Sequence, residues 1–177
     1  MNDYNPTLKH IDKGEIVLSN SRIVFRNFTG EERKFNEAGK RNFAVVLTPE
    51  LADELEKDDW NVKRKPPKEE GDDEFCFLSV TVSYKGKPPR IILITESMNR
   101  RTTLDEDTAD MVDVAEIETI DMILRPYDWE VNGNCGRKAY LKSIYVTLHE
   151  DELDIKYAGY REAEGFTGEP DVEEFED

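Results

Sequence analysis

The chain has 177 residues, of which 36% are charged, and its formal net charge is −16. This length predicts one domain with tails, and a core large enough to fold without disulfide support. No run of 18 apolar residues and no signal-peptide pattern occurs, and the two cysteines and two histidines lack metal-ligand spacing. We therefore expect a cytoplasmic protein that uses no membrane, metal or cofactor.

The first third of the chain predicts a flexible arm, then strands and one short helix. Residues 1–14 are polar without periodicity, which favours a loose N-terminal arm. Glu15–Phe28 predicts one long strand, or two strands with a bend at Ser19–Ser21, and Arg41–Leu47 predicts the next. Residues 49–55 predict a short helix, because a threonine precedes them and a proline occupies the first helical position.

The middle of the chain alternates between basic loops and apolar strands. Two prolines stop the basic run Lys63–Lys65, and a charged loop follows. Phe75–Tyr84 is the clearest strand: alternate residues from Cys76 onward form an apolar face that we assign to the core. Phe75 and Phe77 then fall on the opposite face. The next segments predict a buried strand, a loop and a short helix, at Ile91–Thr95, residues 96–103 and Asp105–Val114 respectively.

A β-hairpin is predicted at Arg125–Leu148, where two aromatic-rich runs flank Asn132-Gly133. Asn-Gly readily supplies the positive φ angles of a two-residue hairpin turn. In the second arm, alternation places Lys138, Tyr140 and Lys142 on one face. The same alternation continues this face into the apolar residues 144, 146 and 148.

Short strands bounded by Gly, Pro or Asn predict a mainly β fold. We predict an OB-like, five-stranded antiparallel barrel over residues 15–150, with elaborated loops and one or two short helices. An immunoglobulin-like sandwich is the alternative, but it has more strands and a Cys…Trp…Cys spacing that this chain lacks. Residues 151–177 predict a disordered acidic tail, because they combine low hydrophobicity with like charge.

The negative charge is concentrated near the C-terminus. Residues 149–177 hold 12 acids and 2 bases, whereas residues 1–148 hold 28 acids and 22 bases. The distribution of charge matters more than its sum, and a body that keeps 22 bases is compatible with nucleic-acid binding.

Basic residues interleaved with aromatic ones form the candidate site. A ring stacks on a base while lysines and arginines neutralise phosphates, which suits a single-stranded nucleic acid. The candidate ssDNA-binding residues are Arg22, Arg26, Arg41, Trp60, Lys63, Arg64, Lys65, Phe75, Phe77, Lys85, Lys87, Arg100, Trp129, Lys138, Tyr140 and Lys142. Taken singly, each aromatic is better explained by core packing, and each base equally well by a solvated surface position. The set as a whole favours binding.

The end of the tail surrounds one phenylalanine with acids. We expect it to bind replication proteins such as a polymerase, helicase or primase, through Glu173, Glu174, Phe175, Glu176 and Asp177. It could also compete with DNA for the basic surface as a phosphate mimic, or serve only to keep the protein soluble.

The segments SRIVFRNF, RNFAVVL, RPYDWEVNG and KAYLKSIYVTL, together with the acidic tail, resemble those of phage-type single-stranded-DNA-binding proteins. The resemblance covers residues 15–150 and the tail. It implies an OB-fold protein that coats single strands during replication and recombination in the cytoplasm of a bacterial host, and it leaves a homodimer and annealing activity open. In such proteins the tail often ends on the aromatic residue itself, whereas here Glu176 and Asp177 follow Phe175.

Two other classes of protein are alternatives to a DNA-binding protein. An enzyme is disfavoured, because the chain has no Gly-rich phosphate loop, no nucleophile elbow and no His-centred acid–base pair. The acids Asp105, Asp107 and Asp110 lack the pattern of a calcium loop. The serious alternative is an acidic interaction module or DNA mimic that inhibits a nucleic-acid enzyme, whose carboxylates would be spread over the folded body.

Overall fold

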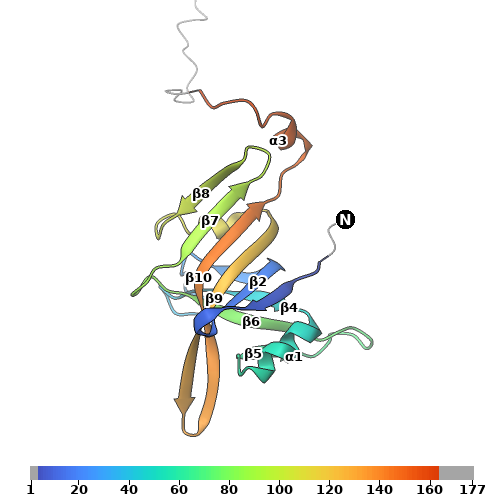
Figure 1. Cartoon of the computed structure of the whole chain (residues 1–177), viewed down its shortest axis with the longest axis vertical. Helices are drawn as coiled ribbons and strands as arrows, with labels where there is room; N and C mark the ends of the chain where they lie inside the picture. The colour runs from blue at the N-terminus through green and yellow to red at the C-terminus, as the bar shows by residue number, and fades with distance from the viewer. Residues whose placement is uncertain (1–3, 164–177) are drawn as a thin grey trace, which may run out of the picture.

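The computed structural model describes residues 4–163, which form ten strands and a few short helices (Figure 1). The strands are β1 Thr7–His10, β2 Ile16–Ser21, β3 Ile23–Asn27, β4 Arg41–Leu47, β5 Val62–Lys65, β6 Phe75–Val82, β7 Arg90–Thr95, β8 Arg100–Leu104, β9 Ile117–Val131 and β10 Asn134–Leu148. The helices are α1 Pro49–Lys57, α2 Met111–Val114 and α3 Glu152–Lys156, with a 3-10 turn, η1, at Asp12–Gly14.

All ten strands belong to one open sheet, whose main path runs β1-β2-β9-β10-β6-β4-β3. Strand β5 pairs with β6, and β7 joins β10 to β8. Strand β10 is central: it pairs antiparallel with β9 but parallel with β6 and β7. The mainly β, OB-like class is confirmed. The predicted count of five strands is too low, and the pairing is not antiparallel throughout, because β10 pairs parallel with β6 and β7.

Three short strands account for much of the difference between the predicted and the observed number of strands. Strand β1 lies in the segment expected to be a loose arm and pairs with β2 along its whole length. Strand β5 includes the basic run Lys63–Lys65, and β8 lies where a loop was predicted. Most residues of β1 and β8 and half of those in β5 are exposed, so their sequences lack the apolar alternation by which strands are recognised.

The longer elements follow the predicted chemistry. Strand β4 has the predicted bounds, and helix α1 begins where Thr48 accepts a hydrogen bond from the Leu51 amide. Asn132 and Gly133 connect β9 to β10 with φ angles of 52° and 82°, as a tight hairpin turn requires. This hairpin extends away from the rest of the sheet in Figure 1.

A β-bulge corrects the predicted facing of β10. Leu141 pairs with Leu124 and Ser143 with Ile123, so Lys142 is an extra residue in the ladder. The core face therefore carries Leu141 before the bulge and Ile144 after it, both buried. Lys138 and Tyr140 thus face away from the core, and the apolar residues that follow do not share their face.

The core lies on the inner face of the curved sheet, under α1 and the α2 region. Strand β6 contributes the apolar face predicted for it, from Cys76 to Val82, and β4 contributes Phe43. The Phe43 ring stacks on Phe28, with centroids 5.1 Å apart, and both rings are buried. No helix of the described residues is long and apolar enough to cross a membrane.

The segment predicted as a disordered tail begins with an ordered helix. Helix α3 starts with a capping box in which Asp151 and Asp154 bond each other's backbone amides. The tail residues from 164 onward, including those expected to bind partner proteins, lie outside the described residues.

Candidate nucleic-acid interface

The outer face of β6 brings several predicted site residues together. Thr81 has Tyr140 of β10 on one side and Asn42 of β4 on the other. Because direct cross-strand partners share a face of a sheet, these three side chains form a row on the side away from the core. Phe77 and Phe75 lie further along the same face of β6.

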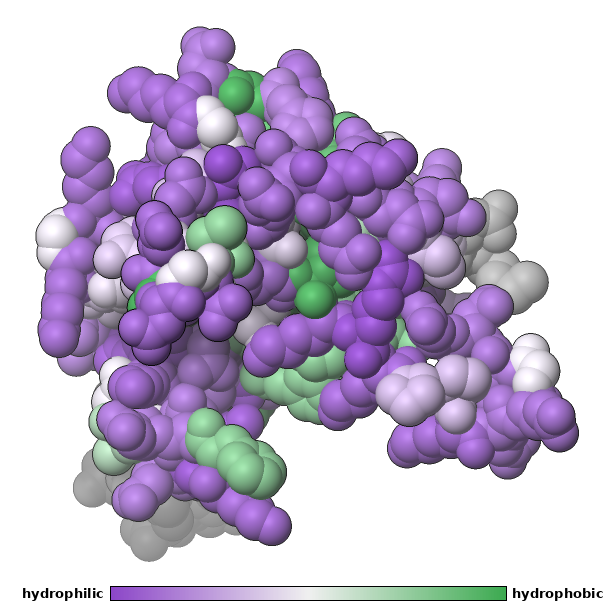
Figure 2. Space-filling view, turned by 90° about the horizontal axis from the view of Figure 1, so that it is seen from below, coloured by the Kyte–Doolittle hydropathy of each residue, from purple (hydrophilic) through white to green (hydrophobic). Residues whose placement is uncertain are grey.

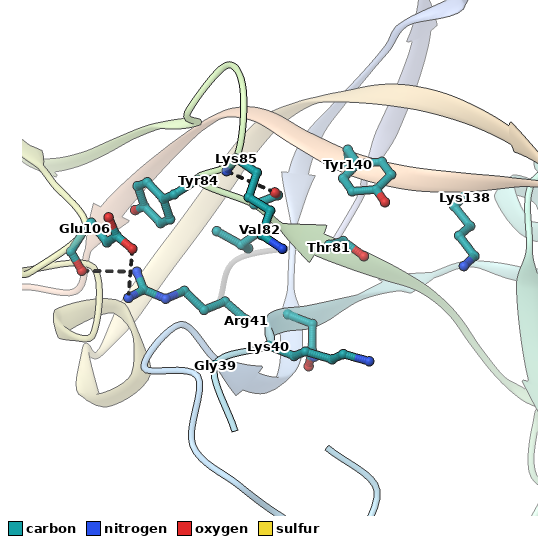
Figure 3. Close-up of a pocket in the computed structure, with 12 residues that line it drawn as sticks. Gly39, Lys40, Arg41, Thr81, Val82, Tyr84, Lys85, Glu106, Lys138 and Tyr140 are labelled. Carbon is teal, nitrogen blue, oxygen red and sulfur yellow. Dashed lines mark hydrogen bonds and ion pairs between the residues drawn. The ribbon is translucent and has the colours of Figure 1, made fainter. Parts of the chain in front are cut away.

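A hollow of about 580 Å³, here called the basic groove, opens at this row. It is lined by Gly39, Lys40, Arg41, Asn42, Thr81, Val82, Ser83, Tyr84, Lys85, Glu106, Lys138 and Tyr140. Four of these twelve residues are basic and one is acidic, in a chain whose acids outnumber its bases by 16. Figure 3 shows Tyr140 and Lys138 extending from β10 toward the side where Lys40 lies.

A second hollow of about 270 Å³ adjoins the basic groove and shares Lys85 and Tyr140 with it. It adds Lys87, Arg125 and Tyr127. The rings of Tyr127 and Tyr140 pack edge to face, with centroids 5.5 Å apart. The two hollows therefore form one basic, tyrosine-lined surface at the stem of the hairpin.

Lys85 and Lys138 of the basic groove, like Lys87 of the adjoining hollow, carry charges that are unpaired in the described part of the chain. Within residues 4–163, none of the three has a carboxylate within ion-pair distance. Lys40 does have one, Glu37 at 3.2 Å, but both side chains are largely exposed. Such a surface pair contributes about 0–1 kcal/mol, so Lys40 can exchange it for a phosphate.

Arg41 is held more firmly. Its guanidinium donates to the backbone carbonyl of Glu106, lies 3.7 Å from that residue's carboxylate, and sits 4.8 Å from the centre of the Tyr84 ring (Figure 3). Burial raises the pKa of Tyr84, and the charge of Arg41 opposes that rise. Arg41 and Tyr84 thus form a rigid end wall of the basic groove.

A second aromatic group, here called the phenylalanine cluster, consists of Phe25, Phe75 and Phe77. Phe25 is exposed and Phe75 half-buried, whereas Phe77, predicted to contact DNA, is buried at 7% exposure and supports the other two rings. The Phe25 ring packs edge to face on both others, at 6.4 and 5.7 Å. The Lys65 ammonium lies 5.2 Å from the centre of the Phe25 ring and 5.7 Å from that of Phe77. Phe25 is 55% exposed and has a φ of 53°, which is unusual for a bulky residue and occurs at a register break in β3. Lys63, opposite Phe77 on β5, is exposed on the same face.

Figure 2 shows the molecule from below, at the end where the hairpin lies. Hydrophilic residues cover most of this face, and a few hydrophobic ones show between them. This is the composition expected of a wet, charged surface rather than of an apolar docking face.

Neither tryptophan belongs to this surface. Trp60 was predicted to stack on bases, but it is 3% exposed and belongs to the core. Its indole donates to Asp58, and the Arg137 guanidinium covers its ring at 5.7 Å. Trp129 is half-buried on the hairpin, where it packs over Gly136. The prediction for Trp60 is therefore wrong, because a ring closed off on both sides cannot accept a base.

Arg64 is committed to the protein itself. It forms ion pairs with Glu56 and Asp53 at 2.7 Å and with Glu74 at 3.1 Å. The hydrogen bonds that the guanidinium donates to these carboxylates raise its pKa further above its ordinary value, and the bond to Glu56 contributes most. Arg64 ties β5 and the β5–β6 loop to α1, and three carboxylates already surround its charge, so we remove it from the site.

Two other predicted contacts are also structural. Arg26 donates to the backbone carbonyls of Val112 and Ala115 and so anchors the α2 region. Lys142, the bulge residue, forms a 2.7 Å ion pair with the buried carboxylate of Glu15. Arg26 fixes the α2 region, and Lys142 neutralises the buried Glu15 carboxylate, from which Arg125 also lies 3.8 Å. Because both cations have partners within the protein, we remove them from the site.

Of the remaining predicted residues, five line the two hollows, whereas Arg22 and Arg100 do not. Arg22 is exposed and lies over the Tyr4 ring at 4.5 Å. Arg100 is exposed on β8 and pairs with Thr95, at the far end of β7 from the basic groove. Arg41, Lys85, Lys87, Lys138 and Tyr140 are brought together as predicted.

Four residues at the surface were not among the predicted site residues: Phe25, Lys40, Tyr84 and Arg125. Lys40 precedes the predicted site residue Arg41, and this adjacency was the only signal in the sequence for any of the four. Phe25 lies within the strand predicted at Glu15–Phe28, and its exposed position coincides with the register break in β3. Within the described residues, no group of three or more His, Cys, Asp or Glu side chains is placed to hold a metal ion.

OB-fold proteins bind single strands in a positively charged groove that carries aromatic side chains, and the basic groove of this sheet has both features. Residues 6–176 match the model of the family described as "Putative phage ssDNA-binding domain". The chain belongs to this family.

The fold has a counterpart among solved structures. The chain resembles the single-stranded DNA-binding protein from bacteriophage Enc34 in complex with ssDNA, with a TM-score of 0.53 and 11% identity over 85% of this chain and 94% of that one. Gp2.5, a single-stranded DNA-binding protein encoded by bacteriophage T7, gives a TM-score of 0.39 and 11% identity, covering 92% of this chain and 100% of that one. A search of curated protein sequences finds no match.

Proposed function

We propose that the protein binds single-stranded DNA, without strong sequence preference, in the basic groove. The observation that carries this proposal is that Lys85 and Lys138, which lack ion-pair partners within residues 4–163, line the groove beside Tyr140. They do so in a protein of net charge −16. Bases stack on Tyr140 and Tyr127, and the lysines with Lys40 hold the backbone. Stacking contributes about 1–3 kcal/mol per base whatever the base, and phosphate contacts add a salt-dependent term.

The strand would then run along the outer face of β6 to the phenylalanine cluster. Phe75 lies six positions before Thr81, which corresponds to roughly 20 Å of strand. Lys63 and Lys65 accompany the phenylalanines from β5. Cations thus flank aromatic rings at both ends of this path, as sequence-independent binding requires.

In this role the protein would coat and protect single strands during phage DNA replication and recombination, in the cytoplasm of the bacterial host. It would act as a binding protein and not as an enzyme. The acidic residues 173–177 with Phe175 would recruit replication proteins or compete with DNA, and a homodimer is compatible with this role. An acidic DNA mimic has less support, because the family match and the clustered cations of the groove both favour binding.

The test is a titration of fluorescently labelled oligo-dT, followed by anisotropy at several salt concentrations. Anisotropy is preferable to intrinsic fluorescence, because Trp60 is buried and Trp129 lies outside the groove. We expect tight binding at low salt, weaker binding to a duplex of equal length, and log K falling with log salt by about 0.7 per phosphate neutralised. No binding at low salt would refute the proposal.

Tyr140→Ala tests the stacking component. Tyr140 is half-buried on the outer face of β10, so truncation should leave the fold intact. Loss of one stacked base should weaken binding by about 1–3 kcal/mol, or roughly 5- to 150-fold in Kd, while Tyr140→Phe retains most of the affinity. Circular dichroism melts of both variants control for unfolding. Equal affinities of the alanine variant and the wild type would show that Tyr140 only packs against Tyr127.

A further inference from the structure

The β3–β4 loop, residues 28–40, holds a phenylalanine that the fold does not use. Phe35 is 93% exposed, the highest value among the exposed large hydrophobic side chains of the described residues. The ammonium of its neighbour Lys34 lies 5.4 Å from the centre of its ring. Lys34 forms no ion pair within residues 4–163. A lysine beside an open aromatic face is the same pairing that we assign to the groove.

The tip that carries Phe35 has a defined backbone conformation. Arg33 and Asn36 exchange two backbone hydrogen bonds, of 2.9 and 3.0 Å, so Lys34 and Phe35 form the apex of a tight turn. The Asn36 side chain donates to the carbonyls of residues 31, 37 and 40. Since these contacts fix the turn in the free protein, a ligand at the apex would not have to order it, which lowers the entropic cost of binding.

The same loop forms a wall of the basic groove. The Gly39 amide donates to the Gly30 carbonyl at 2.8 Å, which closes the base of the loop. Asn42, which lines the groove, donates to the Asn36 side chain at 2.8 Å, and Lys40 lines it as well. The apex is therefore joined to the groove through an unbroken chain of hydrogen bonds.

Two observations argue against a packing role for Phe35. Its ring has no contact with another aromatic residue of the described chain, whereas Phe28 at the start of the loop stacks on Phe43 in the core. An apolar ring left almost fully in water gains nothing from burial on folding. The two ion pairs of the loop, Arg33 with Glu31 and Lys40 with Glu37, lie beside the apex and leave Lys34 available.

We propose that Phe35, with Lys34, is an additional stacking site that takes an unpaired base of the single strand where it leaves the basic groove. This inference rests on the proposed function and adds a contact outside the groove. The ring stacks on the base, and the ammonium group neutralises the adjoining phosphate. The loop thereby lengthens the binding site beyond the sheet.

Phe35→Trp places a fluorophore at this position. We expect oligo-dT to quench its emission, measured as the difference from the wild type, which already contains Trp60 and Trp129. The matched control is Tyr160→Trp, since Tyr160 is 73% exposed near α3, away from the groove. The control should show no change. Labelled oligo-dT and anisotropy monitor binding by both variants independently.

Phe35→Ala supplies a second measurement. We expect at least a roughly fivefold rise in Kd for an oligonucleotide long enough to reach the loop, and an unchanged melting temperature, because the ring packs against no core residue. Anisotropy that reports binding while Phe35→Trp stays unquenched, or is quenched no more than Tyr160→Trp, would overturn the inference and leave the proposed function standing. Absence of binding by the wild type would overturn both.

Discussion

The cations around β5 and those at the basic groove differ in what they contact. Arg64 holds three carboxylates, from α1 and the β5–β6 loop, at 2.7–3.1 Å. Lys85 and Lys138 are exposed at the groove and, within the described residues, have no ion-pair partner. The first kind of cation stabilises the position of a helix, whereas the second keeps its charge free for a ligand. The difference separates cations that are paired within the protein from cations that remain available to a ligand, in a chain where both kinds occur side by side.

The run Lys63–Lys65 contains both kinds in three residues. Strand alternation directs Arg64 toward Cys76 and α1, while Lys63 and Lys65 lie on the face of the phenylalanine cluster. The sequence alone shows one basic patch. The structure divides it into one residue that holds the fold and two that can meet a phosphate.

Charge reversal at the groove should have the largest effect on binding. In Lys85→Glu/Lys138→Glu, two attractive phosphate contacts become repulsive. Each reversal costs on the order of 2 kcal/mol for charges about 4 Å apart in water, which is roughly thirtyfold in Kd. We expect affinity for oligo-dT to fall by at least a hundredfold at low salt, with no change in melting temperature. Anisotropy titrations and thermal melts measure the two quantities.

The matched control is Lys9→Glu, which makes the same charge change as either single groove variant, but on the exposed strand β1. It should lower affinity only by the small long-range effect of added negative charge. An equal loss of affinity in this control and in either single groove variant would show that net charge, and not the groove, governs binding.

Arg64→Ala should have the opposite effect, lowering stability while leaving the affinity for DNA nearly unchanged. Removing the guanidinium leaves three carboxylates of α1 and the β5–β6 loop facing one another without a cation, so the melting temperature should fall. Affinity for oligo-dT, measured on the folded protein, should stay within about twofold of the wild type. Arg64→Lys should restore stability only in part, because one ammonium cannot reproduce the planar guanidinium geometry. A loss of affinity at an unchanged melting temperature would return Arg64 to the interface.

The parts of the fold that local sequence controls could be predicted. The bounds of β4, the cap of α1 and the turn at Asn132-Gly133 depend on residues within a few positions of each other. Strands β1, β5 and β8 could not, because each is specified by the strand beside it rather than by its own apolar pattern. The bulge at Lys142 is also non-local, since Glu15, 127 residues away, holds that ammonium.

The candidate site divides in the same way. Tyr140 and Lys138 were predicted correctly to share a strand face, because alternation alone decides it. Trp60 could not be placed, since its burial depends on Arg137 crossing over its ring. Whether a lysine or arginine is free depends on carboxylates that are distant in sequence, and spacing carries no information about them.

The tail could supply the carboxylates that the groove cations lack, and this gives the smallest expected effect. Residues 162–177 contain eight acids and no base. If they compete with DNA for Lys85 and Lys138, deleting them should raise affinity for oligo-dT several-fold at low salt, because the Debye length is then about 30 Å at 0.01 M. The gain should vanish near 1 M salt, where that length is about 3 Å. Phe175→Ala, which keeps every tail charge, is the control and should behave as the wild type. A deletion that leaves affinity unchanged at every salt concentration would rule out competition and leave partner recruitment or solubility as the role of the tail.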